Sequence, residues 1–302
     1  MKLSIVLVTY NHEKYIRKCI ESIIEQEFDF EWELVIAYDC SADNTLLVAE
    51  EYRDKIKNFS ISIQEKNVGV AINFADALAR TKGELLAFID GDDYNIDIRK
   101  YIKQVAVFDN HSDVVFCFGN GYSYMQSSGK TVPYYEDALR IPQKFDLEYY
   151  YRHNVIINPT TIMCRTSSLP KQFPDFYFKY NNVDWMLTSF CALKGKIFFL
   201  DEALSCYRIH DKSITRTTKS IDYLLRGKWL NEQMNEYLKY EYDWFLGNNS
   251  WYNEQLTYEY VRNREYRMSL RSALKYFSGK NKISVSQLRY FAATIYSILF
   301  KR

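Results

Sequence analysis

Three carboxylates lie within the four residues Asp90-Gly91-Asp92-Asp93, directly after an apolar segment that ends at Ile89. Acidic side chains gathered at the end of a strand repel one another unless a hard cation lies between them. Mg²⁺ and Mn²⁺ are typically held by one or two carboxylates, with water and phosphate completing the shell. The cluster therefore predicts a cation site, and Gly91 permits a close approach of the backbone. An acidic turn that caps the following helix is an equally consistent interpretation of these residues alone.

A second acid, Asp39, stands between the apolar run 35–38 and the polar run 41–45. Its carboxylate is suited to accept a hydrogen bond from an N–H group of a nucleotide base. It is equally suited to an Asx-turn, with Asp43 or Asn44 capping the helix that follows. Read in isolation, this segment leaves both interpretations open.

These acids must be positioned by regular elements, and the first hundred residues alternate short apolar runs with helical patterns. We expect strands at 3–8, 33–38, 60–64 and 84–89, and helices at 13–25, 45–55 and 71–80. Such alternation is typical of a mostly parallel sheet, which binds ligands at the carboxyl ends of its strands. The polar clusters after Val8, Tyr38 and Ile89 fall at those ends, and Asn11 and Asn44 are expected to be helix N-caps.

The alternation loosens beyond residue 100. We expect a helix at 98–110, strands at 114–118, 162–164 and 197–200, a loop at 120–135, and helices at 223–242, 255–277 and 285–300. The sequence thus predicts an α/β domain at 1–217 and a helical extension at 218–302. From Val261 to Arg302 the chain has ten Lys or Arg residues against the single acid Glu265, so the extension is basic.

Composition excludes several classes of protein. The net charge of +1 gives no long-range attraction for a nucleic acid. The six cysteines are scattered, without the spacing of a zinc site, and are interpreted as free thiols. No window approaches the ~20 apolar residues of a membrane span. We therefore expect a cytoplasmic protein.

Five sequence blocks in order resemble family 2 glycosyltransferases. They are Ser4-Ile5-Val6-Leu7-Val8-Thr9-Tyr10-Asn11, Asp39-Cys40-Ser41-Ala42-Asp43-Asn44-Thr45, Asn67-Val68-Gly69, Lys82-Gly83-Glu84 and Asp90-Gly91-Asp92-Asp93. Farther on, Val183-Asp184-Trp185 and the run from Leu200 to His210 resemble later blocks of the family. The resemblance spans about residues 3–215, and implies a GT-A fold with a nucleotide-sugar half at 1–100 and an acceptor half at 101–217.

Site residues carried over from the family fall into three groups. For the nucleotide-sugar they are Val8, Thr9, Tyr10, Asp39, Asn67, Asp90, Gly91, Asp92 and Arg208. For a Mn²⁺ or Mg²⁺ cofactor they are Asp92, Asp90 and His210, the last from a late segment that closes over the diphosphate in some relatives. Asp184 matches the catalytic base, which takes the proton of the acceptor hydroxyl in an inverting transfer. Relatives commonly have Glu where this chain has Val183, so a neighbour of that base differs.

The resemblance implies transfer of a hexose or N-acetylhexosamine, with UDP as the expected carrier, to an acceptor hydroxyl in cell-surface polysaccharide or lipid-linked glycan assembly. A catalytically silent glycan- or nucleotide-binding module is one alternative. A nucleotidyltransferase is another, although Thr9-Tyr10-Asn11-His12 lacks the Gly-rich loop that holds a triphosphate. The basic C-terminal helices suit either an anionic inner-membrane surface, which would make the protein peripheral, or packing on the α/β domain.

Overall fold

Apolar runs of the N-terminal half form the centre of a ten-stranded sheet in the computed structural model. The structure describes residues 1–135, 140–153, 155, 158–213, 218–239, 241, 244–278, 292 and 296, without the side chains of 244–248 and 250. It divides into two compact units, 1–150 with 154–211 and 151–153 with 212–302. The predicted boundary at 217 stays a prediction, because residues 214–217 are outside the described part.

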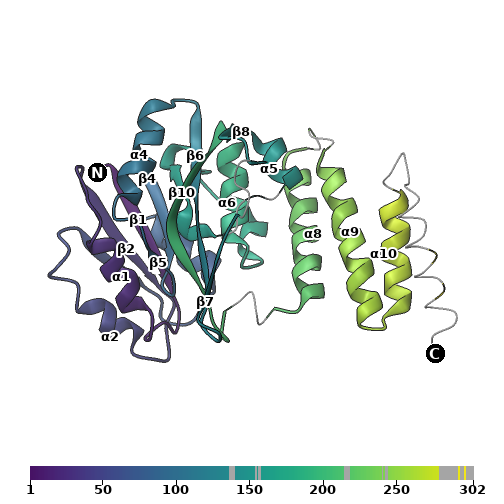
Figure 1. Ribbon diagram of the computed structural model, residues 1–302, viewed down its shortest axis with the longest axis horizontal. Helices are drawn as coiled ribbons and strands as arrows, with labels where there is room; N and C mark the ends of the chain where they lie inside the picture. The colour runs from purple at the N-terminus through teal and green to yellow at the C-terminus, as the bar shows by residue number, and fades with distance from the viewer. Residues whose placement is uncertain are drawn as a thin grey trace. The chain divides into compact units, whose positions relative to one another are not determined.

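Strand order explains how the sheet is assembled (Figure 1). The strands are β1 (Leu3–Thr9), β2 (Trp32–Tyr38), β3 (Phe59–Ile63), β4 (Leu85–Asp90), β5 (Tyr94–Asn95), β6 (Val114–Met125), β7 (Lys130–Pro133), β8 (Lys144–Phe145), β9 (Met163–Arg165) and β10 (Lys196–Ile209). Their order is β3-β2-β1-β4-β9-β6-β10-β5, with β7 on β6 and β8 on β10. β1 is parallel to β2 and β4, and β6 is parallel to β10, whereas β9 is antiparallel between β4 and β6. The mostly parallel α/β fold is confirmed.

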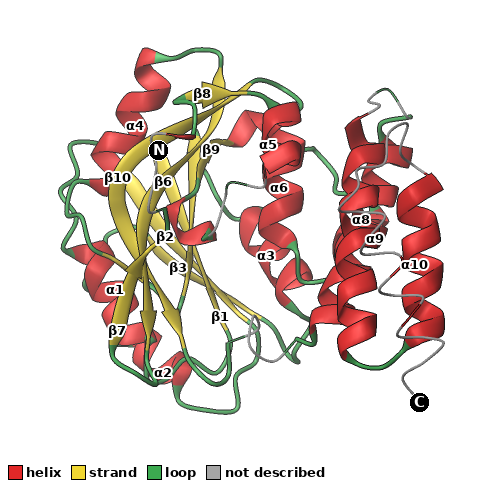
Figure 2. Ribbon diagram, turned by 45° about the vertical axis from the view of Figure 1, so that its right-hand side comes forward, coloured by secondary structure: helices red, strands yellow, loops and turns green. Residues whose placement is uncertain are grey.

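Helices cover both faces of this sheet (Figure 2). In the first unit they are α1 (Ile16–Ile24), α2 (Thr45–Glu50), α3 (Val70–Leu78), α4 (Lys100–Asn110) and α6 (Val183–Ala192), while α5 (Leu147–His153) spans residues of both units. Alternate β1 residues such as Leu3, Ile5 and Leu7 pack in one cluster with buried residues of α1, α2 and α4. On the opposite face the ring of Phe74 in α3 contacts that of Phe88 in β4, 5.1 Å between centroids. The sheet is therefore buried on both sides, which its apolar strands require.

Of the two predicted N-caps, Asn11 is wrong and Asn44 is confirmed in position. Helix α1 begins after Tyr15, and Asn11 instead has a positive φ of 57° and accepts a hydrogen bond from the N–H of Ala42 at 2.8 Å. Asn44 occupies the N-cap position of α2 without a side-chain capping bond. Both asparagines belong to the turns that follow β1 and β2, where polar side chains bond neighbouring backbone.

The loop predicted at 120–135 is also wrong in part. β6 continues to Met125 and forms an antiparallel hairpin with β7, because the Tyr-rich run alternates β-favouring residues and Gly129 adopts a φ of 67° in the turn. Likewise β10 extends well beyond the predicted 197–200. It keeps its pairing with β6 through register shifts between Leu200 and Ala203 and between Ala203 and Ser205.

The second unit contains the helices α8 (Ser220–Tyr237), α9 (Trp244–Arg262) and α10 (Tyr266–Ser278). The helix predicted at 255–277 is two helices, because Arg264 has a φ of 62° and the N–H of Glu265 bonds the carbonyl of Tyr260 at 2.7 Å, which ends α9. Of the helix predicted at 285–300 the structure describes only residues 292 and 296, so that helix stays a prediction. Within the described part of the chain, no helix is both long and apolar enough to cross a membrane.

Candidate functional site

The predicted acids lie at one edge of the sheet because β1, β2 and β4 are parallel neighbours. The N–H of Asp39 bonds the carbonyl of Thr9 at 3.2 Å, and the N–H of Gly91 bonds the carbonyl of Val8 at 2.8 Å. The turn after β1 is thus held between the turns after β2 and β4. This places the two acidic clusters of the sequence on either side of the same short loop.

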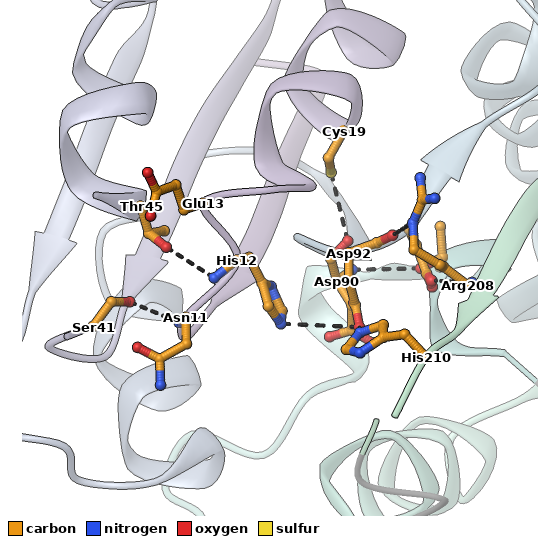
Figure 3. A network of polar contacts seen from close by, with 12 residues as sticks. Asn11, His12, Glu13, Cys19, Ser41, Thr45, Asp90, Asp92, Arg208 and His210 are labelled. Carbon is orange, nitrogen blue, oxygen red and sulfur yellow. Dashed lines mark hydrogen bonds and ion pairs between the residues drawn. The ribbon is translucent and has the colours of Figure 1, made fainter. Parts of the chain in front are cut away.

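Asp92 is the acid of this group that lies beside two histidines (Figure 3). Its Oδ2 lies 3.0 Å from Nε2 of His210 and 3.9 Å from Nε2 of His12. Burial alone would raise the pKa of Asp92, but the hydrogen bond with His210 and the charges of the two imidazoles outweigh burial, so the net pKa is lowered. Asp92 is therefore held as a carboxylate beside two nitrogen donors.

Asp90 is in the opposite electrostatic state. Burial, followed by the negative charges of Asp92 and Asp184, raises the pKa of Asp90 to about 8. Asp184 lies in the first turn of α6, and burial raises its pKa as well. Asp184 is thus close enough to Asp90 for their charges to interact, although 94 residues of sequence separate them.

Arg208 bonds to the acidic turn through both its backbone and its side chain. Its Nε donates to the carbonyl oxygen of Asp92 at 2.8 Å, and its N–H donates to Oδ1 of Asp93 at 2.9 Å. The other carboxylate oxygen of Asp93 accepts from Oγ1 of Thr160 at 2.7 Å. The end of β10 is consequently fixed against the turn that carries Asp90 and Asp92.

Asp39 uses both carboxylate oxygens within the protein. Oδ1 accepts from the N–H of Val68 at 2.7 Å and Oδ2 from the N–H of Gly69 at 3.0 Å, so this acid shapes the 65–69 loop. Each carboxylate oxygen has a second acceptor site, which leaves capacity for a ligand N–H. Asn67 is exposed on that loop.

The first predicted block is divided between the interior and the surface. Val8 is partly buried, Thr9 is fully buried, and Tyr10 is 44% exposed. The Oγ1 atom of Thr9 has no hydrogen-bond partner in the structure. The structure therefore brings the predicted residues of β1, β2, β4, α6 and β10 to one edge, with Tyr10 and Asn67 on the open side.

Sequence reasoning missed four residues of this site. Asp93 was within the recognised tetrapeptide, and His12 directly follows the predicted block at 4–11, so their positions gave a signal. Tyr15 and Thr160 gave none, because Tyr15 matches the apolar stripe of a helix and Thr160 is remote in sequence. Contacts between segments that are distant in the sequence place Tyr15 and Thr160 in the site.

The donor set fits a divalent cation that is completed by a ligand. Asp92 supplies a carboxylate oxygen, His210 supplies a nitrogen, and the unfavourable charge at Asp90 would be relieved by a positive ion. The Nδ1 atom of His12 is buried without a hydrogen-bond partner beside this group. Among the described residues, no group of three or more His, Cys, Asp or Glu side chains is arranged to hold a metal ion, so water and phosphate would have to supply most of the ligands.

Comparison with known proteins assigns the fold and the family. Residues 4–173 match the model of Glycosyl transferase family 2. An uncharacterised protein of Mycobacterium tuberculosis is 30% identical over 213 residues, 70% of this chain and 60% of its own length. The poly(ribitol-phosphate) beta-N-acetylglucosaminyltransferase TarS of Staphylococcus aureus is 40% identical over 119 residues, 38% of this chain and 20% of TarS. The putative teichuronic acid biosynthesis glycosyltransferase TuaG of Bacillus subtilis is 26% identical over 214 residues, 70% of this chain and 81% of TuaG.

Solved structures agree on the architecture. TarS residues 1–349 superpose with a TM-score of 0.67 at 23% identity, covering 97% of this chain and 88% of that one. The mannosyltransferase PcManGT of Pyrobaculum calidifontis, solved with GDP-Man and Mn²⁺, gives a TM-score of 0.58 at 12% identity, covering 99% of this chain and 81% of that one. At these identities the likeness concerns the fold, which confirms the GT-A expectation. With the family match covering more than half of its length, this chain belongs to glycosyltransferase family 2.

Proposed function

We propose that this protein is an inverting glycosyltransferase that moves a hexose or N-acetylhexosamine from a UDP-sugar to an acceptor hydroxyl of a cell-surface polysaccharide or lipid-linked glycan. The observation that carries the proposal is that Asp184, in the first turn of α6, is near enough to Asp90 for its negative charge to raise the pKa of Asp90. Asp184 would therefore be available for the acceptor, while Asp90 and Asp92 would face the diphosphate. TarS has been solved in complex with UDP-GlcNAc, and TarS and TuaG are named as transferases of poly(ribitol-phosphate) and of teichuronic acid biosynthesis, which supports this donor and acceptor class.

Asp184 is assigned the role of general base. An inverting transfer requires one carboxylate to accept the proton of the acceptor hydroxyl as that oxygen attacks the anomeric carbon. A pKa raised by burial makes Asp184 a stronger base than an exposed aspartate, provided that it is ionised at the working pH. No second carboxylate is needed as a nucleophile, in contrast to a retaining glycosidase.

The leaving diphosphate would be received at the end of β4. Asp92, Asp90 and His210 are the residues proposed to hold Mn²⁺ or Mg²⁺, and the bound ion would neutralise the charge that develops on the leaving group. Arg208 would add a fixed positive charge from β10, because its guanidinium is anchored to the carbonyl of Asp92. Asp39, beside Val8, Thr9 and Tyr10, would receive the base.

A screen of nucleotide-sugars for slow hydrolysis with Mn²⁺, Mg²⁺ or EDTA tests the proposal. We expect release of UDP from a UDP-sugar in the presence of the metal, and a large loss with Asp184→Asn when a sugar acceptor is supplied. Binding of a UDP-sugar with no turnover under any condition would instead support a catalytically silent module. Release of pyrophosphate from a nucleoside triphosphate would support a nucleotidyltransferase.

We also propose that the protein acts on the cytoplasmic side of the cell and is peripheral on an anionic membrane surface. Support comes from α10, where Arg267, Arg271 and Lys275 are exposed together with Met268 and Leu274. These positions are spaced so that they share one face of the helix. Cationic side chains flanking exposed apolar ones are typical of helices that lie on anionic lipid.

A further inference from the structure

One aromatic ring contacts all three basic residues around Asp92. The ring of Tyr15 is stacked on the imidazole of His210, with 4.7 Å between centroids and 27° between planes. The guanidinium carbon of Arg208 lies 5.1 Å from the same ring centroid. His12 meets the ring edge-on, with centroids 6.4 Å apart. In the described part of the chain, no other aromatic ring contacts His12, Arg208 and His210 together.

Position in the chain explains why Tyr15 reaches this site. It is the residue before α1, and its N–H bonds the carbonyl of His12 at 2.8 Å, which closes the turn after β1. The same turn places Ile16 in the core beneath the sheet. Tyr15 is thus anchored to a rigid element by its backbone, while its ring faces the end of β10.

We propose that Tyr15 is a positioning residue, whose ring holds Arg208 and His210 in the orientation that receives the diphosphate of the nucleotide-sugar. This inference rests on the proposed function. Stacking against an imidazole and a cation–π contact with a guanidinium both depend on the face of the ring, so the ring and not its hydroxyl is the active feature. Arg208 also lies 5.3 Å from the ring of Tyr94 and 5.8 Å from that of Tyr124, whereas the stacking found for His210 is with Tyr15.

The variants Tyr15→Leu and Tyr15→Phe separate the ring from the hydroxyl. We expect Tyr15→Leu to weaken binding of UDP in the presence of Mn²⁺ by about tenfold, since each lost ring contact is modest in size. Tyr15→Phe should bind UDP within about twofold of the wild type, because phenylalanine keeps the ring face that makes both contacts. Tyr15→Met serves in place of Tyr15→Leu if the latter does not fold.

A spectroscopic measurement reports the geometry without activity. The chain has four histidines, so a proton–carbon spectrum of the histidine rings contains few signals, and His210→Gln assigns the one of interest. The His210 signal should move in Tyr15→Leu, because the ring current of the stacked tyrosine is lost, and should stay in Tyr15→Phe. His111 and His153 are internal controls. Tyr94→Leu is the matched variant, because it removes a ring from Arg208 and should leave the His210 signal in place.

The outcomes distinguish the inference from the function on which it rests. If the wild type binds no nucleoside diphosphate with or without Mn²⁺, the proposed function fails. If the wild type binds UDP and folded Tyr15→Leu binds it equally well, the function stands and the role of Tyr15 is wrong. The role is also wrong if Tyr15→Phe loses as much affinity as Tyr15→Leu, or if the His210 signal is the same in Tyr15→Leu and the wild type.

Discussion

Nε2 of His210, the residue after β10, lies 3.0 Å from Oδ2 of Asp92, which is two residues after β4. The pair joins residues 118 positions apart in the sequence. The two atoms are in hydrogen-bond contact, and a carboxylate oxygen and an imidazole nitrogen are both groups that bind divalent cations, with water and phosphate as further ligands. The pair therefore leads directly to a prediction about metal dependence.

Binding of UDP should require Mn²⁺ or Mg²⁺, because the carboxylate of Asp92 would otherwise repel the diphosphate. Calorimetry with Mn²⁺ and with EDTA should show a loss of about 10²-fold or more in affinity, comparable to the loss of one strong metal contact. Asp92→Asn should reproduce that loss in the presence of Mn²⁺. Equal affinity in EDTA would contradict the role assigned to Asp92 and His210.

Asp184→Asn should lower kcat by about 10²-fold or more, since general-base catalysis contributes about that much. The substitution keeps the shape of the side chain and removes its basicity, so the affinity for UDP should change less than about twofold by the same argument. Steady-state rates and UDP titrations on the same preparation make the comparison. A variant that loses UDP binding and keeps its rate would place Asp184 on the donor side instead.

Asp90 should make the cation-free protein less stable as the pH rises. Its folded pKa of about 8 is above the ordinary 3.8, so the folded state binds this proton more tightly than the unfolded state. The stability contributed by that proton is fully present below pH 3.8 and is lost as the pH rises towards 8. Asp90→Asn should therefore raise the Tm at pH 8 by about 2–4 °C without added metal, the shift expected for about 1 kcal/mol in a domain of this size.

Asp97→Asn is the control for this prediction. The hydrogen bond and charge of Lys103 outweigh the effect of burial and lower the pKa of Asp97, so its substitution should lower the Tm at pH 8. Thermal melts of both variants from pH 5 to pH 8 give the two opposite signs. A fall in Tm at pH 8 for Asp90→Asn would show that Asp90 is not a destabilising charge.

Gly91→Ala should weaken UDP binding by displacing His12. An added Cβ would lie 2.8 Å from Nδ1 of His12, closer than side chains tolerate, and 3.0 Å from Oγ1 of Thr9, which is a tight contact. The imidazole of His12, which faces Asp92, must then move. We expect a loss of about 1–3 kcal/mol in stability, typical of overpacking, together with weaker UDP binding. Adding His12→Ala to Gly91→Ala should restore part of the stability, which a comparison of thermal melts would detect.

The 302-residue chain should sediment with anionic liposomes at low salt and be partly released at high salt, because exposed charges are screened within about 8 Å at physiological ionic strength. Truncation after residue 279, which leaves α10 in place, should weaken this binding, and the combined reversal of Arg267, Arg271 and Lys275 to Glu should weaken it further. Reversal of Lys57 and Lys130, which are exposed in the first unit, is the control. Binding that survives in the triple variant and ignores salt would exclude an electrostatic contact through α10.

Much of the first unit could be predicted because the sequence of each strand and helix shows the apolar pattern of that element. The apolar runs that became β1, β2 and β4 each pair with a strand on either side, and α1, within the helix predicted at 13–25, buries Ile16, Cys19, Ile20 and Ile23. The acids that follow these runs then had to meet at one edge. Local pattern and tertiary structure agree in this region.

What was missed depends on contacts between distant segments. The extension of β6 and β10 past their apolar cores is stabilised by their pairing with each other, up to Ile209 and Met125, which single-strand periodicity does not show. Thr160 enters the site through its bond to Asp93, and Tyr15 through its contacts with β10. The division of the predicted helix at 255–277 depended on the left-handed conformation of Arg264, a residue type that rarely adopts it.

The register shifts of β10 between Leu200 and Ser205 decide which side chains face the acids. Successive residues of a strand point to opposite sides, so Arg208 has one parity and Tyr207 and Ile209 have the other, and His210 follows directly after the end of β10. Removing or adding one residue within the shifts would exchange the two sets and present Tyr207 and Ile209 to Asp92. Removing or adding two residues would again place Arg208 on the side of the acids. Among proteins built on this strand, length variation at this point should therefore occur in even steps.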